Sequence, residues 1–122
     1  MHLMKYIITL GVVLLAFCFG VDATAQKKEL KKARQAYEEL DYYIALENYK
    51  QAQEKGAVLG LEDKLIEGRC YYMMNDITKT YETFAELQDE LKGEDVFIFA
   101  SAQHQMTLYE DAIQWYEKSK LQ

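Results

Sequence analysis

The sequence predicts an all-α protein, on three observations. A pattern of small and aromatic residues occurs three times between residues 26 and 122, with spacings of 35 and then 32 residues. Within each copy the apolar residues recur at helical spacing, as Leu30, Ala33 and Tyr37 do at i, i+3 and i+7. The sequence has no stretch with the strict alternation of a half-buried strand. We therefore expect six helices, at 27–39, 42–54, 61–74, 77–91, 95–106 and 109–121.

The chain is long enough for one domain with its own core. It has 122 residues and a mass of 14.3 kDa, and half of the residues are hydrophobic, including 10 Tyr, 5 Phe and 1 Trp. A disordered chain would be poorer in apolar residues. The sequence contains no proline, and its net charge of −6 argues against nucleic acid as a partner.

The first 25 residues have the pattern of a secretory signal peptide. Lys5 provides the positive charge, residues 6–21 form an uncharged apolar run, and Ala23 and Ala25 are the small residues that signal peptidase requires before Gln26. We expect this segment, 1–25, to be removed, leaving an exported helical repeat domain at 26–122. Cleavage would also remove Cys18, so Cys70 could form no internal disulfide.

Two alternatives for the leader stay open. An uncleaved anchor of 16 apolar residues would extend about 24 Å, which is short of the ~30 Å hydrocarbon core of a bilayer. A lipoprotein signal would end at Cys18, but Phe17 is bulkier than the residue that this motif prefers before the cysteine.

Each copy carries its own start and stop signals. Asp41 and Asp76 directly precede the second apolar run of copies one and two, where an aspartate side chain can accept a bond from a free backbone N–H. Gly56, Gly60 and Gly93 lie between the copies, where helices must end. Small residues that allow close helix approach recur at one position, namely Ala33, Gly68 and Ala100. Aromatic residues that fill the adjoining space recur at another, namely Tyr49, Phe84 and Tyr116.

This pattern resembles the tetratricopeptide repeat (TPR), a helix–turn–helix unit of 34 residues. The resemblance covers the mature chain and implies three antiparallel helix pairs in a right-handed solenoid, at about 26–59, 60–92 and 93–122. Copy three departs from the pattern, because it lacks the aspartate of the turn and has His104 where the other copies have tyrosine. No copy has the proline that often closes such a repeat.

The resemblance implies that the first helix of each pair lines a concave groove that binds a peptide or a partner protein. The groove positions are Arg34, Tyr37, Glu38, Leu65, Arg69, Tyr72, Met73, Phe97, Ser101, His104 and Gln105. We expect Arg34, Arg69 and Tyr72 to contribute most, because Arg and Tyr are frequent at binding hot spots. The alternative is that some of these side chains pack between helices. Ile66 stands where a co-chaperone clamp needs asparagine, which argues against that function.

The residues do not suggest an enzyme, a metal site or a cofactor. His104 is the one histidine of the mature chain, and Cys70 lies on an aromatic-rich face where a thiol is usually inert. Adjacent carboxylates on a helix do not share a face, so we expect four acidic pairs to be solvated. These pairs are Glu38-Glu39, Glu62-Asp63, Asp89-Glu90 and Glu94-Asp95.

Charge is distributed unevenly along the mature chain. Residues 27–34 carry five basic residues and one acidic residue, while the rest of the mature chain has a net charge of −10. Two interpretations stay open for this segment: a solvated helix, or a contact with phosphate or an anionic membrane. The basic residues are Lys27, Lys28, Lys31, Lys32 and Arg34.

We expect a non-catalytic interaction scaffold in the periplasm or at the outer-membrane periphery of a Gram-negative bacterium. The short leader followed at once by repeats resembles envelope proteins of the Bacteroidetes type, some of which continue into an OmpA-like peptidoglycan-binding domain. The alternative is therefore that this chain is the N-terminal portion of such a structural protein of the secretion or gliding machinery. Because Ile113, Trp115 and Tyr116 leave the last helix apolar, we expect a continuation, a partner or a homodimer there.

Overall fold

A computed structural model describes residues 23–121, and this part of the chain is all-α, with no strand. It contains a helix at 23–38, followed by α2 (Tyr42–Glu54), α3 (Leu61–Met73), α4 (Ile77–Ala85), α5 (Glu94–Gln105) and α6 (Tyr109–Ser119). A single 3₁₀ turn, η1 (Gln88–Glu90), lies between α4 and α5. The predicted all-α class and the approximate helix positions are confirmed.

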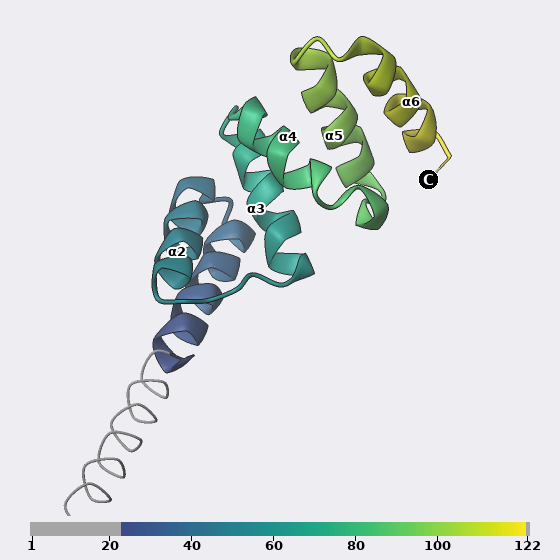
Figure 1. The fold of residues 1–122 in the computed structure, drawn as a ribbon. Helices are drawn as coiled ribbons and strands as arrows, with labels where there is room; N and C mark the ends of the chain where they lie inside the picture. Colours follow the sequence, from purple (N-terminus) through teal and green to yellow (C-terminus); the bar gives the residue numbers. More distant parts are fainter. Residues whose placement is uncertain (1–22, 122) are drawn as a thin grey trace, which may run out of the picture.

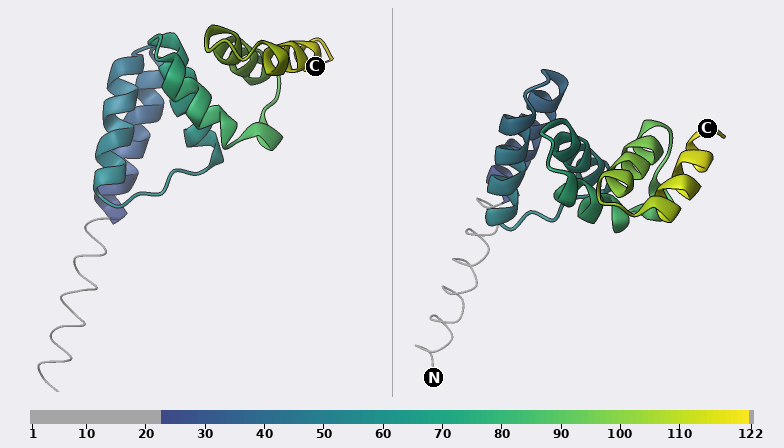
Figure 2. Two further views of the ribbon diagram at one scale, coloured as in Figure 1. Left: turned by 45° about the horizontal axis from the view of Figure 1, so that its top comes forward. Right: turned by 90° about the horizontal axis from the view of Figure 1, so that it is seen from above.

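The helices follow one another in a row, as the views in Figures 1 and 2 show. α3 lies in the middle and packs against α2, α4 and α5, while α5 packs against α4 and α6. The helices are therefore arranged as three consecutive pairs: 23–38 with α2, α3 with α4, and α5 with α6.

The same turn connects the two helices in all three pairs. Leu40, Asn75 and Thr107 have φ values of 63°, 60° and 64°, which is the left-handed conformation that ends many helices. The backbone N–H of the following residue then reaches back to the carbonyl five positions earlier, from Asp41 to Ala36 at 2.8 Å and in the same way in the other two pairs. This turn recurs at the spacing of the sequence copies.

The next helix begins differently in the third pair. The Asp41 and Asp76 side chains accept hydrogen bonds from the N–H groups of Ile44 and Lys79, both at 3.2 Å, so both predicted N-caps are confirmed. Leu108 takes this position before α6 and provides no side-chain cap. The missing aspartate of copy three therefore removes a cap and leaves the turn itself intact.

One predicted helix is too long. We expected a helix at 77–91, but α4 ends at Ala85 and the chain continues through η1. Leu91 is only 3% exposed and packs in the core beside Phe84 and Val96. If the helix continued to residue 91, Leu91 would lie farther along the axis of α4, away from this core. The break at η1 instead lets its side chain pack between α4 and α5.

Two hydrophobic clusters hold the row together. The first joins helix 23–38, α2 and α3 around Tyr49, which is fully buried. The second joins α3, α4 and α5 around Phe84 and Phe99. Because α3 contributes Ile66 to the first cluster and Leu65 to the second, neighbouring pairs share a core.

Candidate interaction surface

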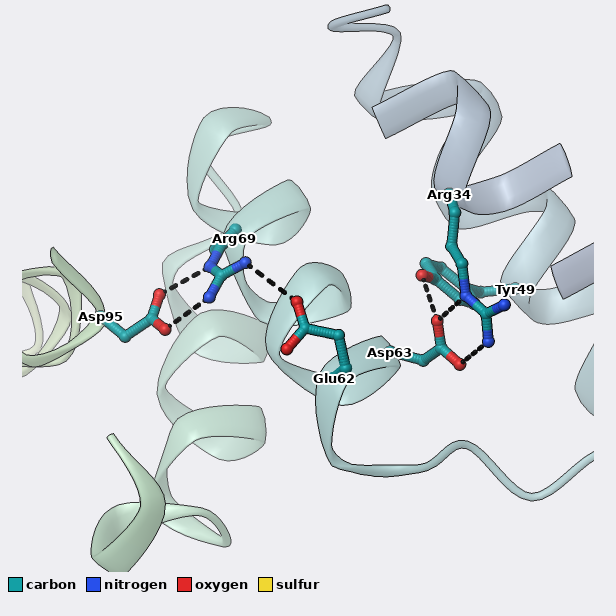
Figure 3. Close-up of polar contacts among 6 residues, drawn as sticks. All are labelled: Arg34, Tyr49, Glu62, Asp63, Arg69 and Asp95. Atoms are coloured by element: carbon teal, nitrogen blue, oxygen red, sulfur yellow. Dashed lines mark hydrogen bonds and ion pairs between the residues drawn. The ribbon is translucent and has the colours of Figure 1, made fainter. Parts of the chain in front are cut away.

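Two arginines expected in a binding groove instead connect neighbouring pairs. The Arg34 guanidinium donates from Nε and Nη2 to the two carboxylate oxygens of Asp63, at 2.8 and 2.7 Å (Figure 3). The hydroxyl of Tyr49 donates to the same carboxylate at 2.9 Å. We call this set of Arg34, Tyr49 and Asp63 the first joint, because it ties helix 23–38 and α2 to the start of α3.

The second joint repeats this connection one pair further along. Arg69 donates from Nε and Nη2 to the carboxylate oxygens of Asp95, both at 2.7 Å, and Glu62 lies 3.8 Å from its Nη1. Phe84 stands at the position of Tyr49 in this copy and has no hydroxyl to donate. We therefore define the second joint as Arg69, Phe84 and Asp95, which tie α3 and α4 to the start of α5.

Electrostatics at the first joint follow from its geometry. The hydrogen bonds from Arg34 hold the pKa of the Asp63 carboxyl below its usual range, although burial acts in the opposite direction. The pKa of Tyr49 is raised mainly by burial and also by its bond to Asp63. At neutral pH this cluster therefore contains a carboxylate, a guanidinium and a neutral phenol.

The expectation of solvated acidic pairs is wrong at two positions. Asp63 and Asp95 are each 5% exposed, while Glu62 beside Asp63 is open to solvent. The sequence did contain a signal for this pairing. Arg34 and Arg69 are 35 residues apart, and Asp63 and Asp95 are 32 apart, so each type recurs at a spacing of the repeat.

The other groove positions divide by exposure. Leu65 is 7% exposed in the second cluster, so its prediction as a groove residue is wrong. Leu65 packs within the second cluster, whereas Phe97, which occupies the same position of copy three, is 48% exposed. The exposed predicted positions are Arg34, Glu38, Met73, Phe97, His104 and Gln105. The half-buried ones are Tyr37, Arg69, Tyr72 and Ser101.

Aromatic side chains gather on the face shared by α5 and α6. The ring of Phe97 lies 5.6 Å from that of Tyr116, and the His104 ring lies 5.8 Å from Tyr109 and 6.1 Å from Tyr116. Tyr109 is 56% exposed. Tyr72 of α3 lies beside α5, because its hydroxyl lies 3.3 Å from that of Ser101. We call Phe97, His104, Tyr109 and Tyr116 the α5–α6 aromatic cluster.

The apolar residues expected to make a dimer face point in different directions. Trp115 packs against Phe99 with ring centroids 4.9 Å apart, and the Lys118 ammonium lies 4.4 Å from its ring. Tyr116 belongs to the aromatic cluster. Ile113 alone among the three predicted residues is strongly exposed, at 61%. Trp115 is therefore part of the core edge rather than of a free surface.

The described part of the chain, residues 23–121, has one cysteine and no group of three or more His, Cys, Asp or Glu side chains placed to hold a metal ion. Cys70 is fully buried, and burial raises the pKa of its side chain to about 12, so the thiol stays protonated at neutral pH.

The expected signal peptide lies mostly outside the described residues. Ala23, Ala25 and Gln26 are part of the helix at 23–38, which begins earlier than the predicted residue 27. Gln26 donates from its side chain to the carbonyl of Lys55 at 2.6 Å. Among the described helices, none has the length and apolar character needed to cross a membrane. Comparison of the chain with protein-family models, curated proteins and solved structures found no match.

Proposed function

We propose that this chain is a non-catalytic, TPR-like scaffold that binds a partner protein through its first helices, 23–38, α3 and α5, and through the adjoining face of α6. The sequence copies, the three matching turns and the two joints all support a right-handed solenoid of three helix pairs. In such a solenoid the exposed positions of the first helices form the concave face.

The α5–α6 aromatic cluster is the observation that carries this proposal. Phe97 and Tyr109 are about half exposed, and neither belongs to the two cores. Exposed aromatic side chains supply contact area at little cost in side-chain entropy, as binding hot spots require. Met73 on α3 is 55% exposed and adds a flexible apolar side chain to the exposed surface of the first helices.

The arginines play a different part in this proposal from the one expected. Arg34 and Arg69 hold neighbouring pairs together, so reversing the charge of Arg69 would loosen the second joint as well as change the surface. We therefore assign partner contact to Tyr72, Met73, Phe97 and the rest of the cluster.

A crosslinking experiment tests this assignment. A photoreactive residue at Gln105 should yield one defined adduct in the native cell, and Phe97→Ser should remove that adduct without changing the thermal midpoint. The same photoreactive residue at Glu90, on η1, is the matched control and should yield no such adduct. Identical adducts from both positions, or an adduct that survives Phe97→Ser, would contradict the proposal.

We further propose that the chain is exported. Cell fractionation should then place a band of about 11 kDa, beginning at Gln26, in the periplasmic fraction. A band of much greater mass in the envelope would instead support the larger OmpA-like structural protein. A cytoplasmic, unprocessed chain would contradict both.

A further inference from the structure

A second surface lies on the side of α3 that faces away from Arg69. Two hollows of about 780 and 430 Å³ follow α3 between α2 and α4. Both are lined by Gln53 and Glu67, whose side chains are bonded at 3.1 Å where the hollows meet. Glu67 and Tyr71 lie on the opposite face of α3 from Arg69 and Tyr72 by helical spacing. We call the two hollows together the α2–α4 groove.

Carboxylates dominate the lining of the α2–α4 groove. Six acidic residues line it, namely Glu47, Glu54, Glu67, Asp76, Glu82 and Glu86. Three lysines line it, at positions 50, 64 and 79. Within residues 23–121, Glu47, Glu54, Glu82 and Glu86 make no ion pair. The groove therefore has unused negative charge along both walls.

The floor of the groove suits the stem and the head of a lysine side chain. Tyr43 is 58% exposed and Met74 is 47% exposed, so apolar surface adjoins the carboxylates. Lys79 already places its ammonium 5.4 Å from the centre of the Tyr71 ring. This contact shows that the aromatic floor accepts a cation. Burial raises the pKa of Glu67, and an incoming cation would stabilise its charged form.

The complementary charge is on the helix at 23–38 of the same molecule. Lys27 and Lys31 form one column at i and i+4, and Lys28 and Lys32 form the adjacent column. All four are exposed. Lys32 lies 3.8 Å from Glu29, whereas Lys27, Lys28 and Lys31 make no ion pair within the described residues. We call these four residues the lysine face.

The lysine face is directed mainly away from the rest of its own chain. Helix 23–38 buries Ala33 and Ala36 against its neighbours, and Lys27 and Lys31 lie on the opposite side of the helix by helical spacing, while Lys28 and Lys32 are exposed at the edge of the buried face. The Lys27–Lys31 column therefore faces away from α2 and α3, where another molecule can meet it. The charges suit such a contact, since 27–34 carries a net charge of +4 and the rest of the mature chain −10.

We propose that the lysine face of one copy docks in the α2–α4 groove of a second copy. The two surfaces differ, so the contact is heterologous, and each docked molecule leaves one groove and one lysine face open. The chain then assembles head to side into open-ended oligomers at low salt. The contact uses neither the α5–α6 aromatic cluster nor Tyr72, so a third protein can bind the exposed faces of α3 and α5 in an assembled chain.

Charge exchange between the two surfaces tests this contact. The full chain would be expressed and exported, its N-terminus checked by mass spectrometry, and its association followed by sedimentation velocity at about 20 mM and about 0.5 M salt. The wild type should associate at low salt and dissociate at high salt. Lys28→Glu with Lys31→Glu, or Glu47→Lys with Glu54→Lys, should each weaken association more than about tenfold, since like charges would then meet.

Mixing the two variants makes the test specific. The equimolar mixture should regain open-ended assembly in which the two variants alternate, because the face of each variant then meets a groove of opposite charge on the other variant. A chain with all four substitutions should regain open-ended assembly. Asp89→Lys with Glu90→Lys is the matched control for the groove variant, since it raises the net charge by the same amount at exposed positions outside the groove, and it should assemble like the wild type.

Three results would overturn the proposal. One is a wild-type chain that stays monomeric at low salt. Another is a mixture of the two variants that fails to associate, although each variant keeps the helical circular dichroism and thermal midpoint of the wild type. The third is a lysine-face variant that assembles as well as the wild type, which would place the contact elsewhere. The crosslinking experiment at Gln105 measures partner binding separately, so a failure of self-assembly would not contradict the proposed function.

Discussion

The first and second joints fasten neighbouring helix pairs with the same bidentate ion pair, yet a different aromatic residue stands beside each. In the first joint Tyr49 donates its hydroxyl to Asp63 at 2.9 Å. In the second joint Phe84 packs closely on Gly68, and a Cβ atom added to Gly68 would lie 2.4 Å from the Phe84 ring. One joint therefore gains a third hydrogen bond, and the other gains close contact between an aromatic ring and a helix backbone.

This difference shows that the arginine–aspartate ion pair is repeated in both joints, whereas the aromatic residue beside it is not. Both arginines lie on the first helix of their own pair, and both aspartates lie in the first turn of the next first helix. The aromatic position follows the local neighbour, because the first copy has Ala33 where the second has Gly68. The joints should therefore respond differently to equivalent substitutions.

The largest expected effect comes from removing the shared carboxylate of the first joint. Asp63→Ala would leave the Tyr49 hydroxyl buried without its acceptor and Arg34 without its partner, so we expect a loss of about 3 kcal/mol in the free energy of unfolding. Asp95→Ala should cost less, about 2 kcal/mol, because Arg69 still has Glu62 nearby and no hydroxyl loses its acceptor.

Urea denaturation measures this contrast. Asp89→Ala is the control, since this aspartate is exposed and should change stability by no more than about 0.5 kcal/mol. Equal losses at Asp63 and Asp95 would mean that the Tyr49 hydroxyl adds nothing to the first joint.

A smaller effect is expected at the close contact of the second joint. Gly68→Ala would place a methyl group 2.4 Å from a ring atom of Phe84, which is fully buried and cannot swing into solvent. We expect a loss of about 2 kcal/mol, since overpacking outweighs the better helix propensity of alanine. Thermal or urea unfolding would measure the loss.

Two further variants sharpen this result. Gly60→Ala meets no atom within 4 Å and should change stability little. Phe84→Leu in the Gly68→Ala background should restore part of the loss, because the smaller side chain leaves room for the methyl group. A Gly68→Ala chain as stable as the wild type would show that the Phe84 ring can move aside.

The smallest expected effect is on the pH dependence of the first joint. The pKa of Asp63 is lowered in the folded chain, so its contribution to stability is present above about pH 4 and is lost as the pH falls through the folded value. Asp63→Asn keeps an oxygen for Tyr49 and removes the charge. The difference in unfolding free energy between wild type and Asp63→Asn should therefore narrow from pH 7 to pH 2. A constant difference over this range would contradict the lowered pKa.

The local features of this fold could be predicted from residues close together in the chain. The N-caps at Asp41 and Asp76 and the helix breaks at Gly56 and Gly93 depend on a few consecutive positions. The prediction went wrong at the end of α4, where the burial of Leu91 between two helices took precedence over helical periodicity.

The candidate surface could be predicted only in part. Periodicity placed Arg34, Arg69 and Phe97 on the same face of their helices, but it could not say which of them the next pair would cover. Arg34 and Asp63 are 29 residues apart, and Arg69 and Asp95 are 26 apart, so their contacts depend on how whole pairs sit against each other. No pattern within one helix reports that arrangement.

The sequence by itself determined the all-α class, the pairing of helices and the recurrence of small and aromatic positions, because each follows from backbone hydrogen bonding and side-chain spacing within about 35 residues. The tertiary structure alone decided that Asp63 and Asp95 are buried, that Leu65 is core and Phe97 is open, and that carboxylates line one groove. Burial and ion pairing depend on which surfaces neighbouring pairs cover, and that is a property of the packed molecule.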